Sequence, residues 1–528
     1  MSIRICKANV IVAACLLGAA ACTDTLVEPK STVTEANIFT DPSSYLKFVA
    51  KLYAGLAVTG QQGPHGNADI VSNDEGFMSY TRLLWNLNEL PTDEAALAWG
   101  DLAIQELNQD IWATTNSFIQ AMYYRIYYQV VLANEFLRQT TDEKLESRGH
   151  TLASLQTEVA FYRAEARFLR ALSYWHAIDF FGNVPLVTEA DPVGGAPPAQ
   201  AARADIYNYI VQELTEIIPL LPPAGPSTYG RANQIAGHML LAKVYLNAEV
   251  YTGTPAWDQA LTEINAVIAG PFTLNPRWRY NFLADNHTSN EIIFPVTQDG
   301  QNTQNWGGTT FLVHAGCGGS IDPNSLGVNG CWGGFRMKPQ AYRNFFPPFQ
   351  AAGDTARTSF FSGTTVEMAN LQTFTDGVAA PKYSNVTSAG VAGADGNHPD
   401  TDYPMFRLAD AYLMYAEAVL RGGGGSAAQA LTYVNQLRGR VYGNTNGDIT
   451  GPELTLDFIL AERSRELLFE GQRRMDLIRF GKFTGDSYLW AWKGGIQGGT
   501  SLDATRALYP IPASELVANP NLQQNPGY

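Results

Sequence analysis

The stretch LQTEVAFYRAEARFLRALSYWHAIDFF, residues 155–181, is the most strongly helical part of the sequence. Four large apolar side chains recur in it at steps of 7, 4 and 3 residues: Phe161, Phe168, Leu172 and Trp175. Such steps place side chains on one face of a helix. Gly182 and Asn183 follow directly, and residues of this kind end helices. We therefore predict a long helix that buries one face and ends at Phe181.

Eight other segments have helical character and come in pairs with short turns: 45–56, 117–138, 206–221, 234–250, 257–268, 406–420, 427–440 and 455–480. The motif Ala171-x-x-Tyr174 recurs as Ala242-x-x-Tyr245, 71 residues later. This is close to two periods of about 34 residues, the period of tetratricopeptide hairpins. The sequence predicts an all-α fold of tetratricopeptide-like helical hairpins. Long loop-rich insertions are expected at three places: 60–115, 270–405 and 484–528.

The composition is that of a folded, weakly charged protein. Charged residues make up 16% of the 528 residues, against about 25% in ordinary soluble domains. Hydrophobic residues make up 45% and aromatic residues 11%, which is enough for a large core and excludes a mainly disordered chain. The net charge of −15 argues against a nucleic-acid partner, because binding to phosphates needs basic patches.

The N-terminus has the layout of an export signal. A short basic start is followed by an apolar run from Ala8 to Ala21. The run is shorter than the ~20 residues that span a bilayer, so it indicates a signal peptide over 1–21. Cys22 follows small residues, as the lipidated cysteine of bacterial lipoproteins does. We predict lipidation at Cys22 and a tether over 22–40; the alternatives are lipidation at Cys15, ordinary cleavage and a retained anchor.

Two cysteines remain after this leader, Cys317 and Cys331, both in glycine-rich sequence. In an exported protein two nearby cysteines most simply form one disulfide. The chain has no CxxC motif and its histidines lack ligand spacing, so we predict no metal site and no cofactor. The segment DGNHPDTD, residues 395–402, resembles a loose calcium-binding loop without the final glutamate of an EF-hand. A structural calcium ion stays open as the alternative.

Several blocks of the sequence resemble the SusD/RagB family. They follow one another in the family's order over essentially the full length: AEARFLRALSYW (164–175), FGNVPLV (181–187), GRAN (230–233), AKVYL (242–246), YPMFRLAD (403–410), ERSRE (462–466), EGQRRMDLIR (470–479), YPIP (509–512) and QNPGY (524–528). The resemblance implies a SusD-like helical fold, with an N-terminal helical region over 41–280 and a C-terminal region over 281–528 that carries the loop-rich ligand face.

The resemblance also implies a function. Family members are lipoproteins on the outer face of the outer membrane, where they capture nutrient glycans for a TonB-dependent, SusC-like transporter. Family members are not enzymes, so the resemblance predicts no enzymatic activity for this protein. The acidic pair Asp93 and Glu94 does not change this, because adjacent carboxylates lack the spacing of a glycoside hydrolase across its substrate. The alternative is import of peptides or other nutrients, which some relatives are thought to serve.

A glycan site needs flat aromatic rings for the apolar sugar faces and planar polar groups for the hydroxyls. Trp99, Trp306 and Trp332 lie in the predicted insertions, and neighbouring glycines would leave them open to a ligand. We select these three as candidate stacking platforms. The alternative for each is a place in the core, where tryptophan is commonly found.

Asp74 and Arg82 precede Trp99 in an order that looks like that of starch-binding family members, where these residues bind the glucan. The resemblance makes α-glucan the predicted ligand, and Asp101 is a further candidate acceptor for sugar hydroxyls. If Cys317 and Cys331 are bonded, the disulfide would stiffen the loop of Trp332 and reduce the ordering cost of binding.

A charge pattern marks the last predicted helix. Four charged residues follow one another at steps of 3, 4 and 3: Arg463, Glu466, Glu470 and Arg473. A stripe of this kind can form an ion-pair network between helices. The alternatives are a solvated helix face and a contact with the transporter.

Overall fold

The computed structural model describes residues 38–528 apart from 66–67, 71–73, 347–352 and 364. The predicted signal peptide, the lipidation site at Cys22 and most of the tether lie outside the described residues. The chain divides into two units, Met1–Ser44 and Tyr45–Tyr528. In the first unit, Asp41 Oδ1 accepts the amide of Ser43, 2.9 Å away, where helix α3 (Ser43–Ala57) begins.

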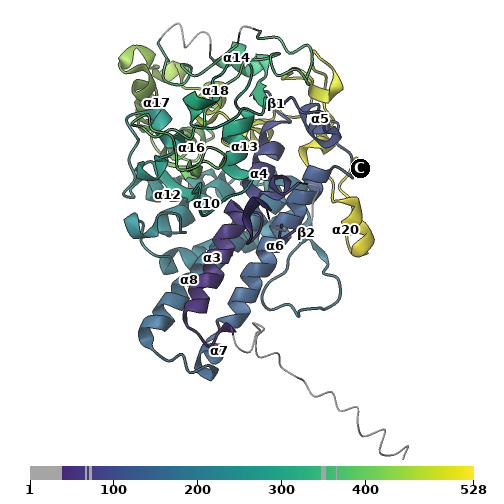
Figure 1. The fold of residues 1–528 in the computed structure, drawn as a ribbon, viewed down its shortest axis with the longest axis vertical. Helices are drawn as coiled ribbons and strands as arrows, with labels where there is room; N and C mark the ends of the chain where they lie inside the picture. Colours follow the sequence, from purple (N-terminus) through teal and green to yellow (C-terminus); the bar gives the residue numbers. More distant parts are fainter. Residues whose placement is uncertain (1–37, 66–67, 71–73, 347–352, 364) are drawn as a thin grey trace, which may run out of the picture. The chain divides into compact units, whose positions relative to one another are not determined.

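Helices dominate the second unit (Figure 1). After α3 they are α4 (Tyr80–Glu89), α5 (Leu102–Asn108), α6 (Ser117–Gln139), α7 (Asp142–Ser147), α8 (Ala153–Phe181), α9 (Arg203–Ile217), α10 (Gln234–Leu246), α11 (Ala248–Thr252), α12 (Trp257–Ile268), α13 (Gly308–Ala315), α14 (Pro339–Phe345), α16 (Leu408–Leu420), α17 (Ala427–Tyr442), α18 (Leu456–Leu467), α19 (Arg473–Arg479) and α20 (Ala513–Ala518). The predicted helical fold class is confirmed. None of the helices in the described part of the chain is both long and apolar enough to cross a bilayer.

Three small antiparallel sheets, each of two strands, occur in the described residues. They pair β1 (Ala95–Leu97) with β5 (Phe335–Met337), β2 (Val184–Pro185) with β3 (Gln200–Ala201), and β4 (Ile292–Val296) with β6 (Tyr403–Arg407). The first and third sheets join segments that are far apart in the sequence. The expected boundary between residues 280 and 281 falls inside a 3-10 helix, Trp278–Phe282, of the second unit.

Helix α8 contains the stretch from which the fold was predicted, and it packs against α6 and α9 (Figure 1). From Ala164 to Phe181 every residue except Arg167 is buried. Arg170 on α8 donates to Glu213 on α9, 2.8 Å away, and to Asn134 on α6, 2.6 Å away. From Ala164 onward the helix is therefore covered on all sides, and paired polar groups replace the solvated face of an ordinary amphipathic helix. Helices α10 and α12, and α16 and α17, form further packed pairs.

The segment 60–115 is not the irregular insertion that we predicted, since it contains α4, β1 and α5. Trp85, expected in a loop, lies in α4 with no exposed surface, and its Nε1 donates to the carbonyl of Phe469 at 3.1 Å. Helix α4 has only 10 residues, a length at which an isolated helix is marginal. Contacts with α6, α13 and α19 stabilise it, and local sequence does not report such contacts.

The predicted helix over 455–480 is two helices, α18 and α19. The chain turns between them, where Phe469 and Gly471 have positive φ angles of 61° and 71°. Glu89 at the end of α4 accepts the amides of Gly471 and Gln472 at 2.6 and 3.2 Å. A carboxylate nearly 400 residues away in the sequence thus satisfies the backbone at this turn.

Two other predicted boundaries were wrong. Phe406 and Arg407 were placed at the start of a helix, but they end strand β6. The predicted helix over 234–250 is interrupted at Asn247, where α10 ends and α11 follows.

The predicted charge stripe does not lie on one helix, because Glu470 belongs to the turn between α18 and α19. Its members are at most 3% exposed, so the solvated-face interpretation is wrong, and burial also excludes an exposed contact with a transporter. Arg407 of β6 pairs with Glu466 and Glu470 at 2.7 Å each. Arg473 donates to Asp93 at 2.7 Å. Such pairs offset their desolvation only where the hydrogen bonding is nearly complete.

Candidate functional site

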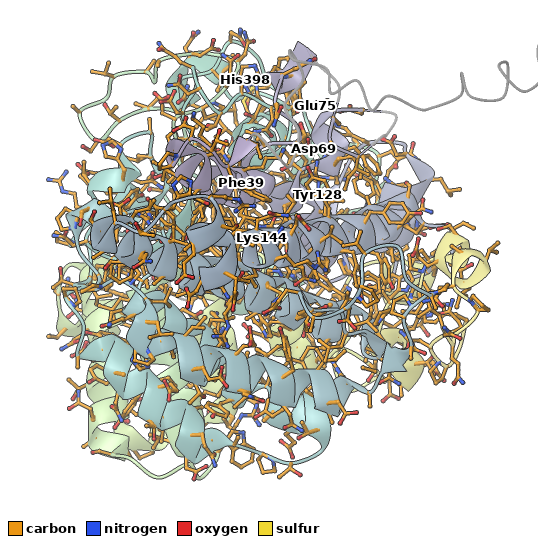
Figure 2. The ribbon with its side chains drawn as sticks, turned by 90° about the horizontal axis from the view of Figure 1, so that it is seen from below. Phe39, Asp69, Glu75, Tyr128, Lys144 and His398 are labelled. Carbon is orange, nitrogen blue, oxygen red and sulfur yellow. A yellow bond between two sulfur atoms is a disulfide. The ribbon has the colours of Figure 1, made fainter. Side chains whose placement is uncertain are left out.

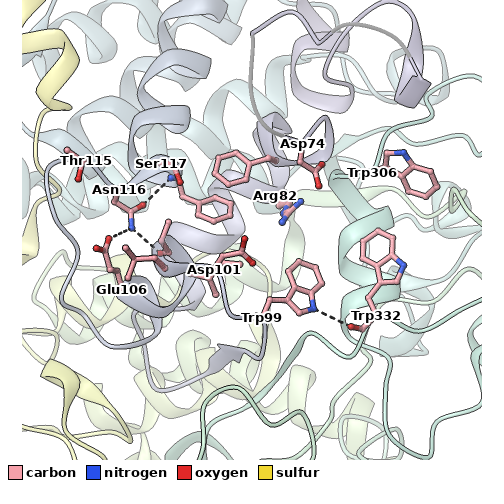
Figure 3. Close-up of a pocket in the computed structure, with 15 residues that line it drawn as sticks. Asp74, Arg82, Trp99, Asp101, Glu106, Thr115, Asn116, Ser117, Trp306 and Trp332 are labelled. Carbon is pink, nitrogen blue, oxygen red and sulfur yellow. Dashed lines mark hydrogen bonds between the residues drawn. The ribbon is translucent and has the colours of Figure 1, made fainter.

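An open cavity of about 610 Å³ lies between α4, α5, the start of α6 and the loops that precede α13 and β5 (Figure 3). Its lining includes all six side chains that the sequence analysis selected for ligand binding: Asp74, Arg82, Trp99, Asp101, Trp306 and Trp332. Four of them lie between residues 74 and 101, and two between 306 and 332. The cavity therefore draws on both of the regions that we expected, 41–280 and 281–528.

The sheet β1–β5 brings the two halves of the site together. Leu97 pairs with Phe335, and the amide of Ala98 donates to the carbonyl of Gly334 at 2.9 Å. Directly beyond this pairing, the indole Nε1 of Trp99 donates to the carbonyl of Trp332 at 3.2 Å. Backbone pairing thus sets the relative position of two candidate platforms that are 233 residues apart.

The three indoles form an arc, which we call the tryptophan arc: Trp99, Trp332 and Trp306. Neighbouring ring centres are 6.3 Å apart at both steps, with interplanar angles of 47° and 51°. All three side chains are half-buried. Figure 3 shows them around one side of the cavity. Neighbouring rings are tilted by similar angles, so the arc offers successive flat surfaces that are not coplanar.

Arg82 points its guanidinium into the same cavity (Figure 3) although the residue is only 6% exposed. Its Nε finds no hydrogen-bond partner among the described residues. Aromatic rings surround it instead, with Phe311 at 4.9 Å and Trp99 at 5.5 Å from its central carbon. Burial lowers the pKa of Arg82 to about 10, although the nearby carboxylates of Asp74 and Asp101 favour its charged form. A buried, incompletely paired donor in a cavity is suited to binding ligand oxygens.

Acidic groups and amides line the rim of the cavity. Asp74 is exposed and accepts the amide of Gly76 at 2.8 Å, in the turn before α4. Asp101 is exposed at the start of α5. On the other side, Glu106 accepts a hydrogen bond from Asn116 at 2.7 Å, and Asn116 also caps the N-terminus of α6. These oxygens are acceptors of the kind that sugar hydroxyls need.

Phe77 and Phe118 also line the cavity, although neither was predicted as a ligand-binding residue. Their rings stack with centres 3.9 Å apart and an interplanar angle of 22°. Phe118 lies in the first turn of a helix that was predicted, but nothing in the sequence distinguishes it from a core residue. Phe77 belongs to a single turn of 3-10 helix, Gly76–Met78, which has no periodic signal.

Glycines beside the platforms have a packing role. A Cβ atom on Gly307 would lie 2.1 Å from the Cβ of Ser79, so only glycine permits this approach of the loop to α4. The amide of Trp306 donates to Glu75 Oε2 at 2.8 Å in the same contact. The glycine after Trp306 therefore holds the platform against the scaffold, rather than only leaving it open as we expected.

Cys317 and Cys331 form a disulfide, with Cα atoms 4.8 Å apart. Trp332 follows directly, and its amide donates to the carbonyl of His314 at 2.8 Å. The amide of Gly333 donates to the carbonyl of Cys317, also at 2.8 Å. The covalent link and the backbone bonds together hold the loop that carries this platform.

In the loop that resembles a calcium site, residues 395–402, the carboxylates accept hydrogen bonds from backbone amides. Asp395 Oδ1 accepts the amides of Asn397 and His398 at 2.6 and 3.1 Å. Asp400 Oδ1 accepts the amide of Gly300 at 2.8 Å. Within the described ranges, no group of three or more histidine, cysteine or acidic side chains is arranged to hold a metal ion. The expectations about calcium and cofactors stay predictions.

Comparisons with known proteins agree with the fold and with the resemblance. Residues 349–528 match the model of the SusD family, and residues 79–246 match a model described as "Starch-binding associating with outer membrane". The starch-binding protein SusD of Bacteroides thetaiotaomicron is 34% identical to this chain over 527 residues, which cover 90% of this chain and 91% of that protein.

Two solved structures share the fold. A SusD homologue from Bacteroides thetaiotaomicron superposes with a TM-score of 0.72 at 19% identity, over 94% of this chain and 98% of that one. Surface glycan-binding protein A from the same organism, in complex with laminarihexaose, superposes with a TM-score of 0.65 at 22% identity, over 91% and 98% of the two chains. With a 34% identical relative across nine tenths of its length, the chain belongs to the SusD family.

Proposed function

We propose that this protein is a non-catalytic glycan-binding lipoprotein of the outer-membrane surface, which captures α-glucan and delivers it to a TonB-dependent, SusC-like transporter. The observation that carries the proposal is the tryptophan arc, which faces the buried guanidinium of Arg82 in one open cavity. Flat apolar rings and charged planar donors in one site match the two kinds of surface that a sugar presents.

The geometry of the arc favours a curved glycan. Rings turned by 47° and 51° at successive steps would follow a chain that coils, as α-glucans do, better than a flat ribbon. The 34% identical relative is named a starch-binding protein, which supports α-glucan as the ligand. A structural neighbour holds laminarihexaose, so this oligosaccharide is the natural competitor in any binding test.

Among the described residues, the carboxyl groups that burial shifts to a clearly raised pKa lie away from the cavity. A glycosidase needs two carboxyl groups across the scissile bond, one of them with a raised pKa. Burial raises the pKa of Glu94 to about 7, of Asp110 to about 7 and of Asp402 to about 6, but these residues lie outside the cavity lining. This distribution supports binding without hydrolysis.

The proposed location and partner rest on the leader and the family. The sequence before Cys22 has the layout of a lipoprotein signal, and the family model over residues 79–246 is described as associating with the outer membrane. Two or more acyl chains would give stable anchoring. Metabolic labelling with a fatty-acid analogue should mark the wild-type protein, and Cys22→Ala should remove the label.

Affinity electrophoresis in gels with and without soluble starch tests the proposed ligand. Retardation by starch, together with calorimetric binding of maltoheptaose, is the expected result. Equal mobility in both gels would exclude α-glucan, and tighter binding of laminarihexaose would reassign the glycan. Binding of a peptide mixture without binding of any glycan would favour the alternative function, import of peptides. New reducing ends after incubation with polysaccharide would overturn the non-catalytic proposal.

A further inference from the structure

We propose that His314 and His398 are positioning residues, which set the separation and tilt of the Trp332 and Trp306 platforms. The inference rests on the proposed glycan-binding function, because it assigns a supporting layer to that site. Neither histidine lines the cavity itself.

Each histidine ring lies against one indole, on a side that is closed to solvent. The ring of His314 is stacked on Trp332 with centres 4.7 Å apart and an interplanar angle of 18°. The ring of His398 lies 4.6 Å from that of Trp306 at 47°. The two histidines are only 2% and 5% exposed. Trp332 therefore lies nearly parallel to the ring of His314, and Trp306 lies against the ring of His398 at an incline, so each imidazole limits the position of one indole.

His314 also joins three segments of the chain. It lies on α13, and its Nδ1 and Nε2 are 2.6 and 3.0 Å from the carbonyl oxygens of Gly330 and Asn397. Gly330 belongs to the disulfide loop that carries Trp332. One turn earlier, α13 presents Phe311 to Trp99, with ring centres 5.9 Å apart at 73°. A single helix thus supports two neighbouring platforms.

His398 continues this support to the third platform. It follows Asn397, whose carbonyl faces His314, and its Nδ1 is 3.2 Å from the carbonyl oxygen of Asn305, the residue before Trp306. Figure 2 shows His398 on the same side of the molecule as Glu75, which accepts the amide of Trp306. A displacement of either histidine would therefore change the spacing between two platforms.

The segment 395–402 gains a role from this arrangement. Its carboxylates hold the backbone around His398, since Asp395 accepts two amides of the segment and Asp400 accepts the amide of Gly300. Residues 395–402, which resembled a calcium-binding loop, therefore support the tryptophan arc through His398. Residues that orient the groups in contact with a ligand are the usual determinants of how accurately a site is formed.

The test compares His314→Ala and His398→Ala with the wild type and with His287→Ala, an exposed histidine that serves as the matched control. Calorimetry measures the affinities for maltoheptaose and for laminarihexaose. We expect each alanine variant to bind the preferred oligosaccharide about tenfold more weakly and to discriminate less between the two. His314→Phe restores a flat ring beneath Trp332 but not the polar contacts of Nδ1 and Nε2, so it should recover only the part of the affinity that depends on the ring. His287→Ala should bind as the wild type does.

Folded variants that keep both the affinity and the discrimination would overturn the inference. If His314→Ala does not fold, His314→Leu fills the volume without a flat ring and takes its place. If the wild type binds neither oligosaccharide, the proposed ligand fails, and near-ultraviolet circular dichroism of the indoles decides this inference separately. An unchanged spectrum in the alanine variants would then overturn it, and a changed indole signal in a folded variant would support it.

Discussion

The guanidinium carbon of Arg82 lies 5.5 Å from the ring centre of Trp99, the first platform of the tryptophan arc. The pair combines a cation that is 94% buried with an indole that is half open to solvent. A buried charge of this kind destabilises the folded state through its desolvation penalty unless a ligand or another group pairs with it. We therefore expect Arg82 to contribute to ligand affinity and not to the free energy of unfolding.

Replacement of Arg82 by leucine should abolish glycan binding and leave the free energy of unfolding unchanged or higher. The reason is that the variant removes a buried charge with an unsatisfied Nε, so little pairing energy is lost. Arg473→Leu is the matched control, because Arg473 is equally buried but paired with Asp93 at 2.7 Å. This control should lose about 3–5 kcal/mol of stability. Urea unfolding and calorimetry measure the two effects, and a strongly destabilised Arg82→Leu protein would contradict this account.

Replacement of Trp332 by alanine should weaken binding by about 1–3 kcal/mol, from lost stacking and apolar contact. The melting temperature should change little, because the indole is half-buried at the cavity rather than in the core. Trp85→Ala provides the contrast: this indole has no exposed surface, and its loss should cost about 3–5 kcal/mol of stability. Trp257, the first residue of α12, is half-buried like Trp332 but lies outside the cavity lining, so Trp257→Ala should leave the affinity unchanged. A large fall in melting temperature for Trp332→Ala would place this indole in the core.

Removal of the disulfide by Cys317→Ser together with Cys331→Ser should lower both stability and affinity. The bond closes a loop with a sequence separation of 14 residues, for which loop entropy predicts about 3 kcal/mol. The affinity should fall because Trp332 follows Cys331 directly and the loop must be ordered on binding. Thermal unfolding and calorimetry of the double variant test this, and equal affinities with and without the bond would limit the disulfide to a role in stability.

Asp110→Asn should stabilise the protein more at pH 8 than at pH 5. Asp110 is buried, and its carboxylate oxygens make no hydrogen bond of good geometry within the described residues. Burial raises its pKa to about 7, although Lys338, Lys493 and Trp490 favour the charged form. The pKa of an aspartate in the unfolded chain is about 3.9. Because the folded-state pKa is higher, the stability that neutral Asp110 allows at low pH is lost as the pH rises through 7. The difference in unfolding free energy between variant and wild type should grow by about 2–3 kcal/mol from pH 5 to pH 8. Asparagine also tolerates the positive φ of 59° at this position.

If Asp110→Asn stabilised the protein equally at pH 5 and at pH 8, the raised pKa of Asp110 would not be the cause. Lys338 and Lys493 face this carboxyl group, and burial lowers the pKa of each to about 8. Because these lysines titrate near pH 8, the measurement at that pH includes their titration, and a further measurement at pH 7 separates it from that of Asp110.

The long helices could be predicted from local periodicity. Residues 257–268 were predicted with the boundaries that the structure shows for α12, because its pattern and its ends are local features. The turn between α18 and α19 could not be predicted in this way. It depends on Glu89 and on positive φ angles at Phe469 and Gly471, and the sequence around 470 is otherwise compatible with a helix.

The candidate site was likewise predicted only in part from the sequence. Resemblance to a family and residue type together selected Asp74, Arg82, Asp101 and the three tryptophans one by one. Neither source showed that Arg82 is buried, that Phe77 and Phe118 join the cavity, or that histidines lie behind two indoles. These facts depend on tertiary contacts, such as those between Phe77 and Phe118 and between Trp99 and Trp332.

By itself, the sequence determined the helical class, the family and the residue types available for a glycan site, because periodicity, composition and ordered motifs are properties of the linear chain. Only the tertiary structure decided which tryptophans form an arc and which lie in the core. The physical reason is that burial and ring orientation come from pairing between distant segments. Trp85 and Trp99 are 14 residues apart, yet the first lies beneath Phe469 and the second opens onto the cavity.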